Sequence, residues 1–143
     1  MASVAPGLAA WGLMTGVAMV KSDLSLPEVL AMALLVYAGS AQLAALPLLV
    51  AGAPPWVVLA TGFCVNLRFV VFSLHLRPYL MHLPRWQRMC HGYFTADISY
   101  VSFVQHHPQP GRTPAEQRAQ EAWLAGCDGL MWLAWVGSSL LGI

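Results

Sequence analysis

The chain contains little charge. Asp, Glu, Lys and Arg make up 9% of its 143 residues, whereas 58% are hydrophobic and the mean hydropathy is +0.62. Ordinary soluble domains carry about 25% charged residues, which keep their surfaces hydrated. A chain this poor in charge cannot cover a globule of its own size with polar side chains. The composition therefore favours a membrane protein over a soluble domain.

The signatures of several functional classes are also missing. The net charge is +1, and no basic run with interleaved aromatic residues suggests contact with nucleic acid. The sequence has no P-loop, no His and Cys spacing typical of a zinc site, and no set of nucleophile and base. We therefore expect neither an enzyme nor a bound metal or cofactor, and no nucleic-acid partner.

Cysteine is scarce as well. Cys64, Cys90 and Cys127 are widely spaced, odd in number and without a CxxC motif, so they are interpreted as free thiols. No basic residue precedes the first apolar run. A cleaved signal peptide is therefore not expected, and Val4–Val20 is interpreted as part of the mature protein.

Long apolar runs make up most of the chain. A spanning helix needs about 20 mainly apolar residues. Five hydrophobic segments occur: Val4–Val20, Val29–Ala53, Trp56–Leu80, His91–Val104 and Ala122–Ile143. The clearly hydrophilic stretch, 105–121, is expected to be a surface loop. We therefore predict an all-α protein, a polytopic integral membrane helix bundle that forms a single transmembrane domain over residues 1–143.

Small residues predict how two of these segments pack. Gly12 and Gly16 share one helix face in GxxxG spacing, which lets another helix approach closely. The small residues of "YAGSAQ", followed by Pro47, interrupt the second segment. We expect a broken helix there.

Two helix starts carry capping patterns. Ser25 is expected to cap a helix whose first turn holds Glu28, since a carboxylate suits the positive end of the helix dipole. At the end of the hydrophilic stretch, Thr113 is expected as N-cap, Pro114 as the first helical residue and Glu116 as the third.

Basic loop residues predict the orientation, because Lys and Arg concentrate in cytoplasmic loops. If all five segments span, the loop with Lys21 and the loop with Arg77, Arg85 and Arg88 lie on one side. We expect that side to face the cytoplasm and the N-terminus to face outward.

Polar residues at membrane depth are candidate functional groups. Arg68 lies inside the third segment, where a charge costs about 2.5–3.5 kcal/mol on insertion scales. Asn66 is two residues earlier, about 200° away on a helix. Asp97 and Asp128 are the carboxylates of the apolar segments. Three interpretations stay open: an Arg68–Asp97 pair that ties two helices, a position on a substrate or proton path, and snorkelling to the interface.

For Gln42 and Asp128, too, a functional role and a structural role must be weighed. The amide of Gln42 can hold the ammonium or carboxylate of a zwitterion, or bond a neighbouring helix, and both interpretations stay open. Asp128 lies beside Gly126 and Gly129 near the start of its segment. It is expected at a helix end rather than in a site.

Three ordered motifs resemble the AzlC-like family, the large subunits of branched-chain amino-acid exporters. They are "VYAGSAQLAALPLLVAGAP", "VNLRFVVFSLHLRPYL" and "YFTADISYVSF". The third departs from the family pattern, because Ala96 and Ile98 stand where the family has threonine and glutamate around Asp97. Family members generally continue with further hydrophobic spans, so a short variant or a fragment is expected.

The resemblance implies a transport subunit in the inner (cytoplasmic) membrane that exports branched-chain or other small neutral amino acids. A small AzlD-like membrane subunit is implied as its partner. We expect Asp97 to couple transport to protons or ions. The expected substrate-binding residues are Gly39, Ser40, Gln42, Asn66 and Arg68. The alternative is a non-transporting membrane subunit in which these polar residues are structural.

Overall fold

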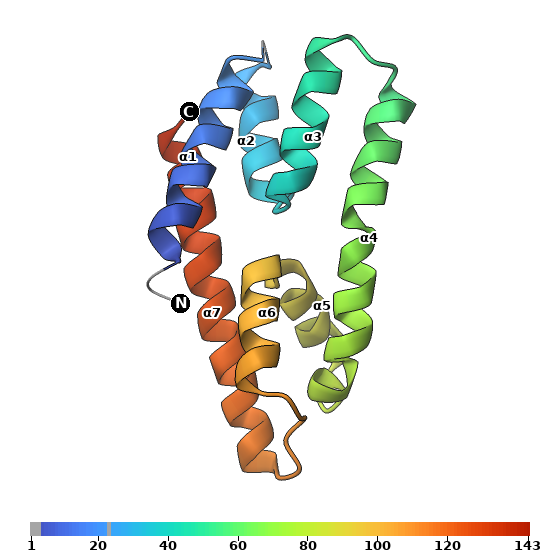
Figure 1. Cartoon of the computed structure of the whole chain (residues 1–143), viewed down its shortest axis with the longest axis vertical. Helices are drawn as coiled ribbons and strands as arrows, with labels where there is room; N and C mark the ends of the chain where they lie inside the picture. Colours follow the sequence, from blue (N-terminus) through green and yellow to red (C-terminus); the bar gives the residue numbers. More distant parts are fainter. Residues whose placement is uncertain (1–3, 23) are drawn as a thin grey trace. The chain divides into compact units, whose positions relative to one another are not determined.

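The computed structural model describes residues 4–22 and 24–143, and over these residues the chain is helical without any strand (Figure 1). The predicted all-α class is confirmed for this part of the chain. Its helices are α1 (Ala5–Val20), α2 (Leu26–Leu35), α3 (Gly39–Val50), α4 (Pro55–Leu80), α5 (Arg85–Phe94), α6 (Asp97–His106) and α7 (Pro114–Leu141).

The contacts divide the described chain into two units. Unit 1 contains residues 69–131, and unit 2 contains residues 4–68 together with 132–143. The border falls inside α4 and inside α7, so each of these helices contributes to both units. Each unit has its own core and its own helix break, and each is described separately below.

In unit 2, α1 packs closely against the end of α7. Gly12 and Gly16 are buried, and a Cβ added to either would overlap Ser138 or Ser139. Ser139 Oγ also donates a hydrogen bond to the carbonyl of Gly12 at 3.1 Å. The predicted close approach at the GxxxG motif is confirmed, since only glycine leaves room for this contact.

The rest of unit 2 is built from α2 and α3. Met19, Val29, Ala33 and Leu46 form its buried apolar cluster. As predicted, α2 begins after Ser25, whose backbone N–H donates to Glu28 Oε2 at 2.8 Å.

The second hydrophobic segment is broken where the small residues predict it. Residues 36–38 separate α2 from α3, and α3 begins at Gly39 within the AGSAQ motif. The expected interruption at Pro47 is wrong, because Pro47 lies inside α3. Only the small-residue stretch breaks the helix.

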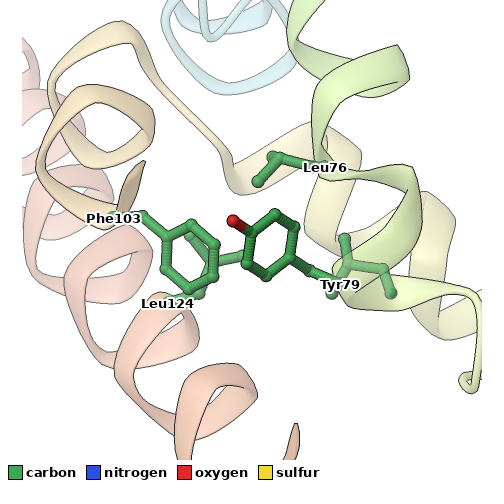
Figure 2. Close-up of a cluster of buried hydrophobic side chains, with 5 residues drawn as sticks. Leu76, Tyr79, Phe103 and Leu124 are labelled. Atoms are coloured by element: carbon green, nitrogen blue, oxygen red, sulfur yellow. The ribbon is translucent and has the colours of Figure 1, made fainter. Parts of the chain in front are cut away.

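The core of unit 1 is aromatic. Leu76, Tyr79 and Leu80 of α4 pack with Phe103 of α6 and Leu124 of α7 (Figure 2). The rings of Tyr79 and Phe103 meet at 74°, with centroids 5.1 Å apart, and Tyr79 donates its hydroxyl proton to the carbonyl of His107 at 2.9 Å. The hydroxyl of Tyr79 thus finds a partner while both rings stay buried.

The fourth hydrophobic segment, expected as one continuous stretch over His91–Val104, is two helices instead. Thr95 and Ala96 interrupt it between α5 and α6. Thr95 closes α5, since its N–H and its hydroxyl both donate to the carbonyl of His91, at 2.9 and 2.7 Å. Ser99 Oγ accepts from the N–H of Ala96 at 2.9 Å and so caps the start of α6.

The hydrophilic stretch 105–121 is a loop only up to Thr113. From Pro114 it is the start of α7, as the capping pattern predicts, and Thr113 Oγ1 accepts from the N–H of Glu116 at 3.3 Å.

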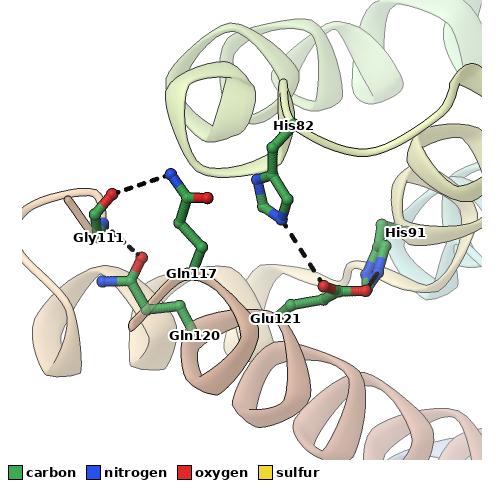
Figure 3. Close-up of polar contacts among 6 residues, drawn as sticks. All are labelled: His82, His91, Gly111, Gln117, Gln120 and Glu121. Carbon is green, nitrogen blue, oxygen red and sulfur yellow. Dashed lines mark hydrogen bonds and ion pairs between the residues drawn. The ribbon is translucent and has the colours of Figure 1, made fainter. Parts of the chain in front are cut away.

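Polar contacts hold this loop against the first turns of α7 (Figure 3). Gly111 donates its N–H to Gln120 Oε1 at 2.9 Å and accepts from Gln117 Nε2 at 3.2 Å. Glu121 lies 3.7 Å from His82 and 4.0 Å from His91. The hydrophilic stretch is therefore fastened to unit 1.

Two helices of the described chain, α4 and α7, are long and apolar enough to cross a membrane. The apolar helices α1, α2 and α3 are shorter, with 16, 10 and 12 residues. Large apolar side chains of α4 are exposed, among them Leu59 (73%) and Phe63 (69%). An apolar surface of this kind suits lipid better than water.

Candidate functional site

The break between α2 and α3 is held by one side chain. Gln42, 1% exposed, donates both protons of its Nε2, to the carbonyl of Met32 at 2.7 Å and to that of Val36 at 2.8 Å. Its Oε1 is buried and has no hydrogen-bond partner among the described residues. Gln42 therefore has an acceptor left and no donor, so it suits an ammonium group and not a carboxylate.

A guanidinium lies at the start of α3. Arg68 Nη2 donates to Ser40 Oγ, and Ser40 belongs to the first turn of that helix. Ala38 at the N-cap makes no side-chain capping bond, so this end of α3 keeps its positive character. Two positive features therefore meet in unit 2, an arginine and a helix N-terminus. Together they complement an anion such as a carboxylate.

Gly39 is covered rather than open. A Cβ added there would overlap the six-membered ring of Trp135, which is itself 4% exposed. Gly39 is one of the expected substrate-binding residues, and an indole ring fills the space beside it. Trp135 adds an apolar wall beside the AGSAQ motif, and this was not foreseen from the sequence.

Asn66 is half-buried in α4, and its Oδ1 is enclosed without a hydrogen-bond partner in the described part of the chain. The structure thus brings Ser40 and Arg68 together and places Gly39 and Gln42 on the same short helix. Asp97 is the first residue of α6 and belongs to unit 1, whereas Arg68 belongs to unit 2. The predicted Arg68–Asp97 ion pair stays a prediction.

Asp128 is the acidic residue that the sequence interpretation misplaced. It was expected at a helix end, but α7 begins at Pro114, so Asp128 lies well inside the helix and is 1% exposed. Thr95, at the break between α5 and α6, has its hydroxyl 3.2 Å from Asp128 Oδ2. A carboxyl group within an apolar segment does indicate a buried polar site. Gly126 and Gly129, which lie nearby, suggested a helix end instead.

Unit 1 also contains a cavity of about 640 Å³ between α4 and α5. Arg77, Arg85 and Arg88 line it together with apolar side chains that include Phe72 and Leu76, and no carboxylate does. Its volume lies in the range of small-molecule pockets. The arginines complement an anion, but the lining offers no acid for an ammonium group.

Metal chemistry has no support in the described residues, which contain no group of three or more His, Cys, Asp or Glu side chains able to hold an ion. Cys64, Cys90 and Cys127 are free thiols.

No curated protein and no solved structure is significantly similar to the chain. A family model described as AzlC protein matches residues 3–143, which is nearly the whole sequence. This family comprises membrane transporters associated with branched-chain amino-acid transport rather than enzymes. The chain therefore belongs to the AzlC family, as its AGSAQ and Asn-Leu-Arg motifs and the segment YFTADISYVSF predict.

Proposed function

We propose that the chain is the transporting subunit of an exporter of branched-chain or other small neutral amino acids. It is a multi-pass protein of the cytoplasmic membrane, and an ion gradient drives it, since its sequence has no P-loop. The family match supports transport as the activity. The substrate, the export direction and the coupling are our proposal.

The observation that carries the proposal is the hydrogen bond from Arg68 to Ser40 at the start of α3. A guanidinium offers a planar fork of donors, which fits a carboxylate with two parallel bonds. Secondary transporters bind substrate carboxylates at the N-termini of discontinuous helices. The break before Gly39 supplies such a terminus, so an amino acid's carboxylate would replace Ser40 as the partner of Arg68.

The remaining parts of a neutral amino acid also find complementary groups in unit 2. Gln42 Oε1 and Asn66 Oδ1 are buried acceptors without a partner among the described residues, and an ammonium group donates three protons. Leu43 of α3 and the ring of Trp135 supply apolar surface near the same motif. An aliphatic side chain is therefore favoured over a charged one.

The membrane location is supported by α4. Its apolar 18-residue window has no buried residue, although its mean hydropathy is 2.0. Exposure of that much apolar surface to water is unfavourable by about 25 cal/mol per Å², whereas lipid tails accept it without cost. The five hydrophobic segments of the sequence are accordingly assigned to a multi-pass arrangement.

A small AzlD-like membrane subunit is the proposed partner, on the strength of the family resemblance. The alternative function is a non-transporting subunit in which the buried polar groups are structural. One observation favours it: Gln42 donates both of its amide protons to the carbonyls of Met32 and Val36, which is a structural role. The experiment below separates the two.

The test is counterflow in proteoliposomes that contain the purified chain, with and without a small partner subunit. Vesicles preloaded with unlabelled leucine should accumulate labelled leucine transiently. Isoleucine and valine should compete, whereas lysine and glutamate should not. Absence of counterflow above that of empty vesicles, with the partner present, would favour the non-transporting role.

A further inference from the structure

The α5–α6 break faces a buried acid. Asp128 of α7 is 1% exposed, and Thr95 and Ser99 present their hydroxyl groups to its carboxyl group. In the described part of the chain, the contacts of Asp128 are with the hydroxyl groups of Thr95 and Ser99, and none of them involves a lysine or an arginine. An acid enclosed within a membrane helix is a functional-site candidate by default.

The hydroxyl of Thr95 has two neighbours but only one proton. Its Oγ1 lies 2.7 Å from the carbonyl of His91 and 3.2 Å from Asp128 Oδ2. A carbonyl oxygen accepts and never donates, so the shorter contact requires the Thr95 proton to point to His91. The proton between Thr95 and Asp128 must then belong to Asp128.

The hydroxyl proton of Ser99 is likewise engaged by a backbone carbonyl. Ser99 Oγ donates to the carbonyl of Ala96 at 3.0 Å and accepts from its N–H at 2.9 Å. Its single proton is therefore also engaged by the backbone. Asp128 Oδ1 has no hydrogen-bond donor among the described residues. An ionised carboxylate here would be buried without a cation and would compete with the carbonyls of His91 and Ala96 for the hydroxyl protons of Thr95 and Ser99, which is unfavourable.

We propose that Asp128 is a proton-binding site, occupied in this conformation, whose carboxylic acid donates from Oδ2 to Thr95 Oγ1. The neutral acid is compatible with both contacts of the Thr95 hydroxyl, because Thr95 keeps its bond to His91 and still accepts from Asp128. Its chemistry is that of a proton carrier placed at a discontinuous helix. The site lies within unit 1 and shares no residue with the proposed substrate residues of unit 2, and only its use in transport rests on the proposed function.

Release of the proton would change the break itself. Thr95 lines the cavity of unit 1 and Asp128 does not, so the proton of Asp128 would pass to Thr95 Oγ1 while the hydroxyl proton of Thr95 leaves to a water molecule of the cavity as hydronium. A carboxylate would remain at Asp128. The carboxylate would then attract the hydroxyl proton of Thr95 away from His91. One of the two bonds that close α5 is lost, while the backbone bond at 2.9 Å remains. Protonation is thereby linked to the geometry between α5 and α6.

Other titratable groups surround the site and must be distinguished from it. Cys127 precedes Asp128 on α7 and interacts with its charge. His91 on α5 pairs with Glu121 on α7, and Asp97 begins α6 two residues after Thr95. A measurement of total proton uptake would mix these groups, so the test must resolve single carboxyl groups.

The experiment is infrared spectroscopy of the full chain in lipid nanodiscs at neutral pH, with aspartate labelled with ¹³C at its carboxyl carbon. The protonated carboxyl band of the wild type should shift with the label. Asp128→Asn should abolish that band, whereas Asp97→Asn should retain it. Thr95→Val, which removes the hydrogen-bond acceptor, should move it to higher frequency, and Thr95→Ser should not.

A labelled band that survives Asp128→Asn, or its absence from the wild type, would overturn the proposal. Asparagine keeps the site neutral and donates to Thr95 in the same way, so this variant is expected to fold. Circular dichroism of each variant checks this. The spectrum needs no substrate, so failure of amino-acid counterflow with an intact Asp128 band would disprove the proposed function alone.

Discussion

The two helix breaks of this chain use opposite chemistry. The break over residues 36–38 is held by the amide of Gln42 and has the guanidinium of Arg68 at the helix that follows. The break at Thr95 and Ala96 is held by hydroxyl groups and faces the acid of Asp128. The first arrangement complements an anion and the second holds a proton. A protein that couples an amino acid to an ion gradient needs both kinds of group.

The breaks also differ in how they are made. Small residues follow the first break and leave the backbone to be covered by other side chains, as Trp135 covers Gly39. The second break has no glycine or proline and depends on side chains that bond their own backbone. Substitutions should therefore affect the first break through packing and the second through single hydrogen bonds. Four predictions follow this contrast in order of size.

The largest effect is expected at Gly39. Gly39→Ala places a methyl group inside the Trp135 ring and should destabilise unit 2 by about 3 kcal/mol, the upper end for overpacking. Gly62→Ala is the matched control, since nothing lies within 4 Å of the added group, and it should be neutral or stabilising. Chemical unfolding in mixed micelles measures both. Equal stability of the two variants would mean that Trp135 does not cover Gly39.

A smaller loss is expected for Gln42→Leu, which keeps the size and removes two hydrogen bonds. At about 1 kcal/mol for each bond, the free energy of unfolding should fall by about 2 kcal/mol. Gln87→Leu on the exposed side of α5 serves as control and should change little. If both variants unfold alike, the first break is held by the backbone alone.

Thr95→Val should cost about 1.5 kcal/mol, since the hydroxyl loses its bond to His91 and its longer bond with Asp128, whereas the backbone bond from Thr95 to His91 persists. Thr95→Ser should restore most of it. The same unfolding assay applies. A loss as large as that of Gly39→Ala would contradict the proposed difference in how the two breaks are stabilised.

The smallest effect concerns the start of α2, the helix that leads into the first break. The hydroxyl of Ser25, at 2.5 Å, and then its backbone N–H lower the pKa of Glu28, which precedes the apolar segment. A lowered pKa stabilises the folded state above the unfolded value of about 4.3, and this contribution disappears as the pH falls through the folded value. Unfolding midpoints measured between pH 6 and about pH 3 should show this loss in the wild type and not in Glu28→Gln. An identical pH profile for both would assign no role to this cap.

The first break could be predicted from the sequence and the second could not. Alanine and glycine around Gly39 interrupt an apolar run visibly, and the AGSAQ motif drew attention to it. The segment around Thr95 has no proline and no run of small residues, and the break there depends on hydrogen bonds that side chains make within the folded chain. Capping patterns at Ser25 and Thr113 were reliable because they act within one helical turn.

The candidate site was predictable in its residues and less so in its geometry. Ser40 and Arg68 came from adjacent motifs, and they do meet. Asp128 was assigned to a helix end because Gly126 and Gly129 lie beside it, although the capping pattern at Thr113 places the start of α7 much earlier. Trp135 had no signal at all, since its contact with Gly39 joins positions far apart in the chain. Long-range packing of this kind is not encoded in local patterns.

The central claim is that Arg68 binds the carboxylate of the transported amino acid, and leucine counterflow by Arg68→Lys tests it most directly. Lysine keeps the charge and loses the fork, so counterflow should fall about ten- to a hundredfold. Arg112→Lys, in the loop before α7, is the matched control and should exchange leucine like the wild type. Wild-type counterflow by Arg68→Lys in correctly inserted protein would contradict the account.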